Sequence, residues 1–283
     1  MNDETGSFWE WIIPFCFFIT GAWVVWHLPA YILTFAPHAN ESKLAQVTAI
    51  HQTKDVSPNL PGLFGGVADP IDWIALILLP ILLVIGVRGV RVAHMEFQHW
   101  RATDRLAIFI GRVVMMLIIS MTCVMLYEVF LRYAIEAPTL WANEVTLWIG
   151  GFVFLLSGFY GMQQRSHIRI FILYDAVPRW LQRVFDTVWV FIFVVLAFFL
   201  IYGSYKQVFI VKFYNWEMFG TAFDPPIPAT IQPMVLIVIV LVAIQAVLNL
   251  INDWNLEPEV HTAADDIDED ELEAIKRAVQ GDK

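Results

Sequence analysis

The sequence predicts an all-α fold: a polytopic membrane helical bundle with six transmembrane helices and one interfacial amphipathic helix. Hydrophobic residues make up 58% of the chain and charged residues only 16%, and the mean hydropathy is +0.63. A water-soluble domain carries about 25% charged residues. The apolar residues also gather into six runs, each long enough to cross a bilayer, which takes about 20 residues. Together these observations favour a multi-span membrane protein.

Polar connectors separate the six apolar runs. Asp69 and Pro70 precede the second run, and an N-cap residue followed by proline is typical of a helix start. The stretch 168–177 is strongly apolar but too short to cross the bilayer, so we expect it to lie along the interface. Pro178 follows directly and ends this apolar stretch. The predicted spans are 8–28, 71–87, 106–131, 141–162, 185–205 and 231–251.

The basic residues predict the orientation of the spans. Connectors 88–105 and 163–183 carry four arginines each. The positive-inside rule therefore places both connectors in the cytoplasm. With six spans, the N-terminus and the C-terminus are then both cytoplasmic. The connectors on the opposite side hold fewer basic residues, which are Lys43, Lys54, Arg132, Lys206 and Lys212.

We expect three parts along the chain. Residues 1–105 form an N-terminal extension with two transmembrane helices and a periplasmic loop, and residues 106–251 form a four-helix membrane domain. Residues 252–283 form an acidic cytoplasmic tail, in which positions 253–283 hold 11 acidic and 3 basic residues. Most of the net charge of −10 therefore belongs to the tail. The basic clustering of a nucleic-acid-binding face is missing, so no nucleic-acid partner is predicted.

The sequence offers little intramembrane chemistry. Ionisable groups inside spans are costly and usually functional, yet the seven histidines lie at a span end, in connectors and loops, or in the tail. There is no glycine-rich phosphate loop and no HExxH motif. We therefore predict that the protein is not an enzyme and has no cofactor and no metal site.

Charged and aromatic residues gather where the third and fourth predicted spans meet. Glu128 and Arg132 are spaced i, i+4, which favours a helical ion pair. Trp141, Glu144 and Trp148 share one helix face at i, i+3, i+7. We hypothesise that Arg132 bridges Glu128 and Glu144 and so holds the hairpin together beneath an aromatic belt. The alternative is that each charge extends separately to the interface and the tryptophans are ordinary belt residues.

The order of several short motifs resembles one transporter family. The motifs are Arg132-Tyr133, Trp141-x-x-Glu144, a glycine-containing apolar span, His167-Ile168-Arg169-Ile170 and Pro178. They resemble the small membrane subunit (DctQ-type) of tripartite ATP-independent periplasmic, or TRAP, transporters, in an extended form with two extra N-terminal spans. The resemblance covers residues 106–251. One departure is Phe171, which stands where the family often has an acid.

The resemblance implies a multi-pass subunit of the bacterial inner (cytoplasmic) membrane, embedded in the lipid bilayer and without a catalytic role. It implies two protein partners: a large DctM-type permease subunit with the sodium and substrate sites, and a periplasmic solute-binding protein that delivers a solute, commonly an organic acid. The expected structural and motif residues are Glu128, Arg132, Trp141, Glu144, Trp148, Arg165, His167, Arg169 and Pro178.

Two other classes of protein remain as alternatives. A stand-alone six-span channel or membrane enzyme would need a polar pathway through the bilayer, and the nearest candidates are Gln207, Gln245 and Asn249. A membrane receptor or assembly factor would dock through the acidic tail. There, the stretch 268–279 has apolar residues on one face of a predicted helix.

Overall fold

The computed structural model describes residues 8–35, 68–91, 93, 96, 100–165, 174, 177–214, 216–221 and 223–255. Every regular element in these ranges is a helix, which confirms the predicted all-α class. The α-helices are α1 (Phe8–Trp26), α2 (Leu28–Phe35), α4 (Pro70–Gly89), α5 (Arg105–Phe130), α6 (Ala142–Gln163), α8 (Arg179–Tyr205) and α9 (Ile227–Asp253). A 3-10 turn, η1 (Ala102–Asp104), precedes α5, and the π-helical turns η2 (Leu131–Ile135) and η3 (Lys206–Phe213) extend α5 and α8.

All six predicted spans form helices. Five helical segments in the described ranges are long and apolar enough to cross a membrane, and a shorter apolar helix, Glu10–Trp26, corresponds to the first predicted span. The protein is therefore a polytopic helical membrane protein. The five segments are Pro70–Gly89, Ala102–Ile135, Ala142–Gln163, Arg179–Phe213 and Ile227–Asp253. The predicted interfacial helix at 168–177, apart from Tyr174 and Val177, and the predicted tail helix lie outside the described residues.

Two of the spans are longer than the sequence predicted. The helical segment Ala102–Ile135 has 34 residues and Arg179–Phe213 has 35, because a π-helical turn continues each helix. At 1.5 Å per residue each is roughly 50 Å long, against a hydrocarbon core of about 30 Å. These two helices must therefore tilt or project beyond the hydrocarbon at one end.

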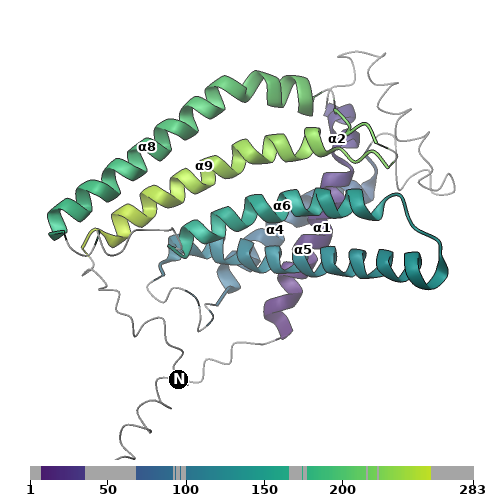
Figure 1. Ribbon diagram of the computed structural model, residues 1–283, viewed down its shortest axis with the longest axis horizontal. Coiled ribbons are helices and arrows are strands. Elements are labelled where there is room, and N and C mark those ends of the chain that lie inside the picture. Colours follow the sequence, from purple (N-terminus) through teal and green to yellow (C-terminus); the bar gives the residue numbers. More distant parts are fainter. Residues whose placement is uncertain are drawn as a thin grey trace, which may run out of the picture.

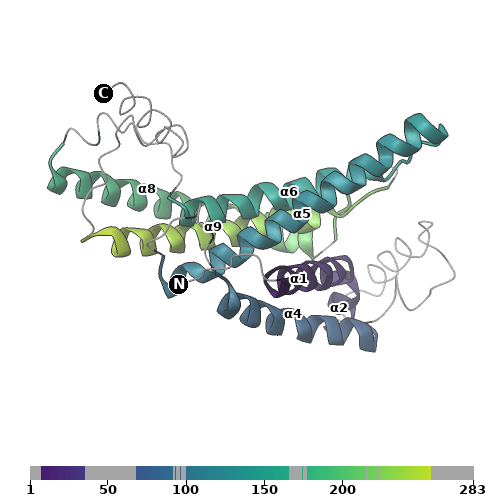
Figure 2. The same cartoon turned by 90° about the horizontal axis from the view of Figure 1, so that it is seen from below.

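The helices form a row with two further helices on one side of it. Figure 1 shows α8, α9, α6 and α5 following one another across the molecule, and each packs against the next. Figure 2 shows α1 beside this row and α4 beyond α1. Helix α1 packs against both α4 and α5, so the N-terminal extension is in contact with the four-helix part.

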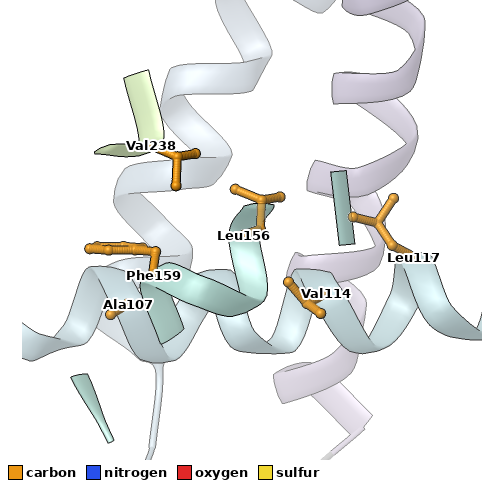
Figure 3. Packing of buried hydrophobic residues seen from close by; sticks show 6 residues of the cluster. All are labelled: Ala107, Val114, Leu117, Leu156, Phe159 and Val238. Carbon is orange, nitrogen blue, oxygen red and sulfur yellow. The ribbon is translucent and has the colours of Figure 1, made fainter. Parts of the chain in front are cut away.

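The hydrophobic core lies where α5, α6 and α9 meet. Phe18 of α1 packs against this core, so the extension contributes to it. The domain boundary at residue 105 stays a prediction, although α1 and α5 pack together. The buried residues of this cluster, drawn in Figure 3, are Ala107, Val114, Leu117, Leu156, Phe159 and Val238.

The second span begins as the sequence predicted. Asp69 is the N-cap of α4: its carboxylate accepts a hydrogen bond from the backbone N–H of Asp72 at 2.9 Å. Asp72 completes a capping box by accepting from the backbone N–H of Asp69 at 3.0 Å. The indole N–H of Trp23 also donates to Asp72 Oδ1 at 2.9 Å, which joins α1 to α4 at this end.

A buried carboxylate joins the connector before α5 to the four-helix row. Glu96 accepts hydrogen bonds from Arg112 Nη2 at 2.9 Å and from the Tyr160 hydroxyl at 2.7 Å. Arg112 lies on α5 and Tyr160 on α6, and the Arg112 guanidinium also lies 5.9 Å from the centre of the Trp11 ring on α1. The ion pair therefore holds the extension, α5 and α6 together at one point.

The close approach of α4 to α5 requires glycine at position 86. A Cβ at this position would lie 2.1 Å from Phe109 Cε2. We expect Gly86→Ala to displace the Phe109 ring and to lower the free energy of unfolding by about 1–3 kcal/mol. Thermal unfolding of the purified protein in detergent, followed by tryptophan fluorescence, measures this change.

Gly89→Ala is the matched control on the same helix, because no atom lies within 4 Å of a Cβ there. We expect this control to leave stability unchanged or slightly raised, since alanine favours helix over glycine. Equal losses from both variants would show that α4 does not pack closely on Phe109.

Candidate functional site

The candidate site lies where α5 ends and where α6 and α9 begin. We call this end of the bundle, predicted to be periplasmic, the outer end, and the opposite end the inner end. Glu128 is on the last turn of α5 and is only 1% exposed. Its Oε1 accepts hydrogen bonds from Arg132 Nη2 at 2.6 Å and Nε at 3.2 Å. The predicted i, i+4 ion pair between Glu128 and Arg132 is confirmed.

Glu128 also holds the link between η2 and α6. Its second oxygen, Oε2, accepts from the backbone N–H of Thr139 at 3.0 Å and from the Thr139 hydroxyl. The link reverses direction at Glu136, which has a left-handed backbone with φ 59°. The buried Glu128 carboxylate therefore binds both Arg132 of η2 and Thr139 of the link that follows. Sequence reasoning missed Thr139 as a partner of Glu128.

The second half of the predicted bridge is wrong, because Glu144 does not pair with Arg132. Glu144 Oε2 instead accepts hydrogen bonds from the Thr221 hydroxyl at 2.6 Å and from the backbone N–H of Asp224 at 3.0 Å. Both donors belong to the loop between η3 and α9. Helix α6 packs between α5 and α9, and the Glu144 carboxylate in its first turn binds the loop that leads into α9 rather than the end of α5.

The loop bound by Glu144 is itself tightly turned. Asp224 adopts a left-handed backbone with φ 61°, and its Oδ1 accepts from the backbone N–H of Gly220 at 2.5 Å. Gly220 has φ 87°, a conformation that glycine adopts without steric cost. The η2–α6 and η3–α9 loops are thus held in the same way, each by a glutamate that accepts from a threonine hydroxyl and a backbone N–H.

The two tryptophans of the predicted belt have different surroundings. Trp141 precedes α6 and packs against Tyr127 of α5, with ring centres 6.1 Å apart. The indole N–H of Trp148 donates to Thr230 Oγ1 on α9 at 2.8 Å, and its ring lies 6.0 Å from that of Trp26 on α1. Trp148 therefore joins three helices inside the protein.

At the inner end, Arg165 and Pro178 are the two motif residues that the structure describes. The Arg165 guanidinium binds the Asp253 carboxylate with two parallel hydrogen bonds of 2.7 and 2.8 Å. This pair joins the end of α6 to the end of α9. Pro178 is the N-cap of α8. His167 and Arg169 lie outside the described residues.

Three polar side chains buried near the inner end, those of Asp104, Gln245 and Asn249, are joined by hydrogen bonds. Gln245 Nε2 donates to Asp104 Oδ1 at 2.7 Å and to Asn249 Oδ1 at 2.9 Å. Asn249 Nδ2 donates to the carbonyl oxygen of Met162 at 2.7 Å. These groups join η1, α6 and α9 near the inner end. Across the described ranges, no three His, Cys, Asp or Glu side chains are placed to hold a metal ion. The chemistry of these contacts is structural.

A comparison with protein families identifies the part of the chain that holds these contacts. Residues 121–255 match the family described as "Tripartite ATP-independent periplasmic transporters, DctQ component". This part of the chain, just under half of the sequence, is similar to the DctQ component. The resemblance predicted from the motif order is thereby confirmed, and the protein is a component of the bacterial inner membrane. Comparisons with curated proteins and with solved structures gave no match.

The DctQ match begins within α5 and ends just after α9. It contains Glu128 and Glu144, the loops that they hold, and the Arg165–Asp253 pair of the inner end. Helices α1 and α4 lie outside it. The contacts of Glu96 and Trp26 therefore join the extension to the DctQ part.

Double-mutant cycles distinguish the observed partner of Glu144 from the predicted one. We expect Glu144→Ala and Thr221→Ala to be coupled by about 1 kcal/mol in the free energy of unfolding, because one variant removes the acceptor and the other its donor. Glu144→Ala and Arg132→Ala should be additive within about 0.5 kcal/mol. Unfolding of the single and double variants in detergent gives both coupling energies.

A coupling between Glu144 and Arg132 as large as that between Glu144 and Thr221 would restore the predicted bridge. Glu136→Gln is the control for loss of a negative charge at the same end, because Glu136 is exposed. We expect this control to have no measurable effect on the free energy of unfolding.

Proposed function

We propose that this protein is the small permease subunit of a TRAP-type secondary transporter, and that it scaffolds a large DctM-type subunit rather than catalysing a reaction. The family match supports a transporter component. One observation carries the scaffold role: four buried polar side chains form hydrogen bonds to neighbouring helices or loops of the same chain. They are Glu96, Glu128, Gln245 and Asn249.

The outward faces of the helices support the same proposal. Helix α8 presents a long series of exposed aromatic rings, among them Phe191, Phe198 and Tyr202. Helix α9 exposes β-branched residues at three- and four-residue spacing, which form one stripe along the helix: Ile237, Val240, Ile244, Val247 and Ile251. Within a bilayer, helices associate by close packing of such surfaces rather than through buried charge.

In this proposal the solute and the coupling ion bind elsewhere in the complex. The large subunit carries the substrate site and the site for the coupling ion, which we take to be sodium. A periplasmic binding protein delivers an organic acid or a related solute. The contribution of the DctQ part is a fixed arrangement of helix ends, because Glu128 holds the η2–α6 loop and Glu144 holds the η3–α9 loop.

Purification of the tagged full chain from its native membranes tests the proposal. We expect a large TRAP permease subunit, identified by mass spectrometry, to remain bound at a constant ratio through size-exclusion chromatography. We also expect liposomes that contain only this chain to show no ion or organic-acid flux, because the polar groups of its spans are engaged in packing. Flux would appear only with the large subunit and the binding protein.

Two results would contradict the proposal. One is a chain that purifies without a permease subunit from membranes that contain one. The other is flux by the chain alone, which would support the stand-alone channel. Glu144→Ala, which removes the acceptor that holds the η3–α9 loop, is the comparison variant. We expect it to keep the large subunit bound, since its contacts lie within one chain.

A further inference from the structure

Four arginines converge on the last turn of α9 at the inner end. Arg101 Nη2 donates to the carbonyl oxygen of Asn252 at 3.5 Å, and Arg179 Nη2 donates to that of Asp253 at 3.1 Å. We call the four residues the arginine cluster: Arg101, Arg165, Arg179 and Arg183. Arg165 binds the Asp253 carboxylate, as described above.

Arg183 of the arginine cluster forms no ion pair with a carboxylate of the described residues, whereas Arg165 is paired with Asp253. Its guanidinium carbon lies 5.3 Å from the centre of the Trp254 ring, a cation–π contact. Its Nε–H is shielded from solvent and has no acceptor. The amide nitrogen of Asn252, on the facing turn of α9, is also buried without an acceptor. Among the described residues, this corner therefore has four arginines around the single carboxylate of Asp253, and two buried N–H donors that have no acceptor.

Exposed tryptophans place this corner at the level of the lipid headgroups. Trp180 is 65% exposed and Trp254 is 42% exposed, and both lie at the inner ends of spans. Tryptophan is enriched at this depth because its ring is apolar and its N–H is polar. About one turn further into the spans, Val184 on α8 and Ile251 on α9 are exposed apolar residues. Charge at the headgroup level thus adjoins an apolar surface.

We propose that the inner end of α8 and α9 binds the phosphate group of an anionic phospholipid, with Arg183 as the principal contact and Arg179 beside it. The acyl chains would lie against Val184 and Ile251. Charge-assisted hydrogen bonds from arginine to phosphate are strong and geometrically specific. Basic sites between helices on the cytoplasmic side are known to bind anionic headgroups, and the connectors at this end are the ones predicted to be cytoplasmic. Free phosphate shares the charge but has no apolar part to match the exposed residues.

Lipid titration of the delipidated full chain in detergent tests the proposal. Binding of short-chain phosphatidylglycerol and of phosphatidylcholine is measured by native mass spectrometry. We expect phosphatidylglycerol to bind at least roughly tenfold more tightly, the effect of about one charge-assisted hydrogen bond. Arg183→Gln should abolish this preference. Arg88→Gln is the control, because it removes an exposed arginine of the same end outside the arginine cluster and should keep the preference.

Three further measurements make the outcome decisive. Circular dichroism must show that Arg183→Gln keeps the wild-type helix content. The comparison of the two lipids is made on the wild-type protein, so it does not depend on how a variant folds. Equal affinity for both lipids would overturn the proposal. Displacement of phosphatidylglycerol by millimolar inorganic phosphate would assign the site to a free anion instead. A chain ending at residue 255 that binds lipid while the full chain does not would make the acidic tail the occupant and would also overturn it.

Discussion

The structure depends on one constraint: a polar group near the hydrocarbon core must find its partner within the protein, because lipid chains offer none. Glu128 and Glu144 meet this constraint with donors from the adjoining loops. Glu96 meets it with Arg112 and Tyr160. Glu96 and Glu144 each join segments that lie far apart in the sequence, whereas Glu128 holds the loop that follows its own helix. Because each carboxylate must have hydrogen-bond donors close to it, these contacts also hold the neighbouring helix ends in place.

The local features of the fold follow from the sequence, and the distant contacts do not. The Asp69 cap and the Glu128–Arg132 pair were predictable, because both depend on spacings of three or four residues within one helix. The partner of Glu144 was not, since Thr221 is 77 residues away and nothing in its spacing marks it. The order of motifs predicted the family, but only the structure shows which side chains those motifs bring together.

The lengths of the spans illustrate a second limit of sequence reasoning. The predicted third and fifth spans ended near the end of their apolar runs, whereas the helices continue through η2 and η3. A π-helical turn has no distinct composition, because it depends on which hydrogen bonds the last turn makes. Here the turns lie next to the loops that the two glutamates hold, so tertiary contacts rather than propensity decide where these helices end.

The position of Glu96 has a consequence for biosynthesis. The ribosome makes the chain from its N-terminus, so Glu96 enters the membrane region before Arg112 and well before Tyr160, which lies 64 residues later. Until both partners arrive, the carboxylate remains in water and the connector stays undocked. The contacts that Glu96 makes between the N-terminal extension and the DctQ part are therefore completed only after Tyr160 on α6 has been synthesised.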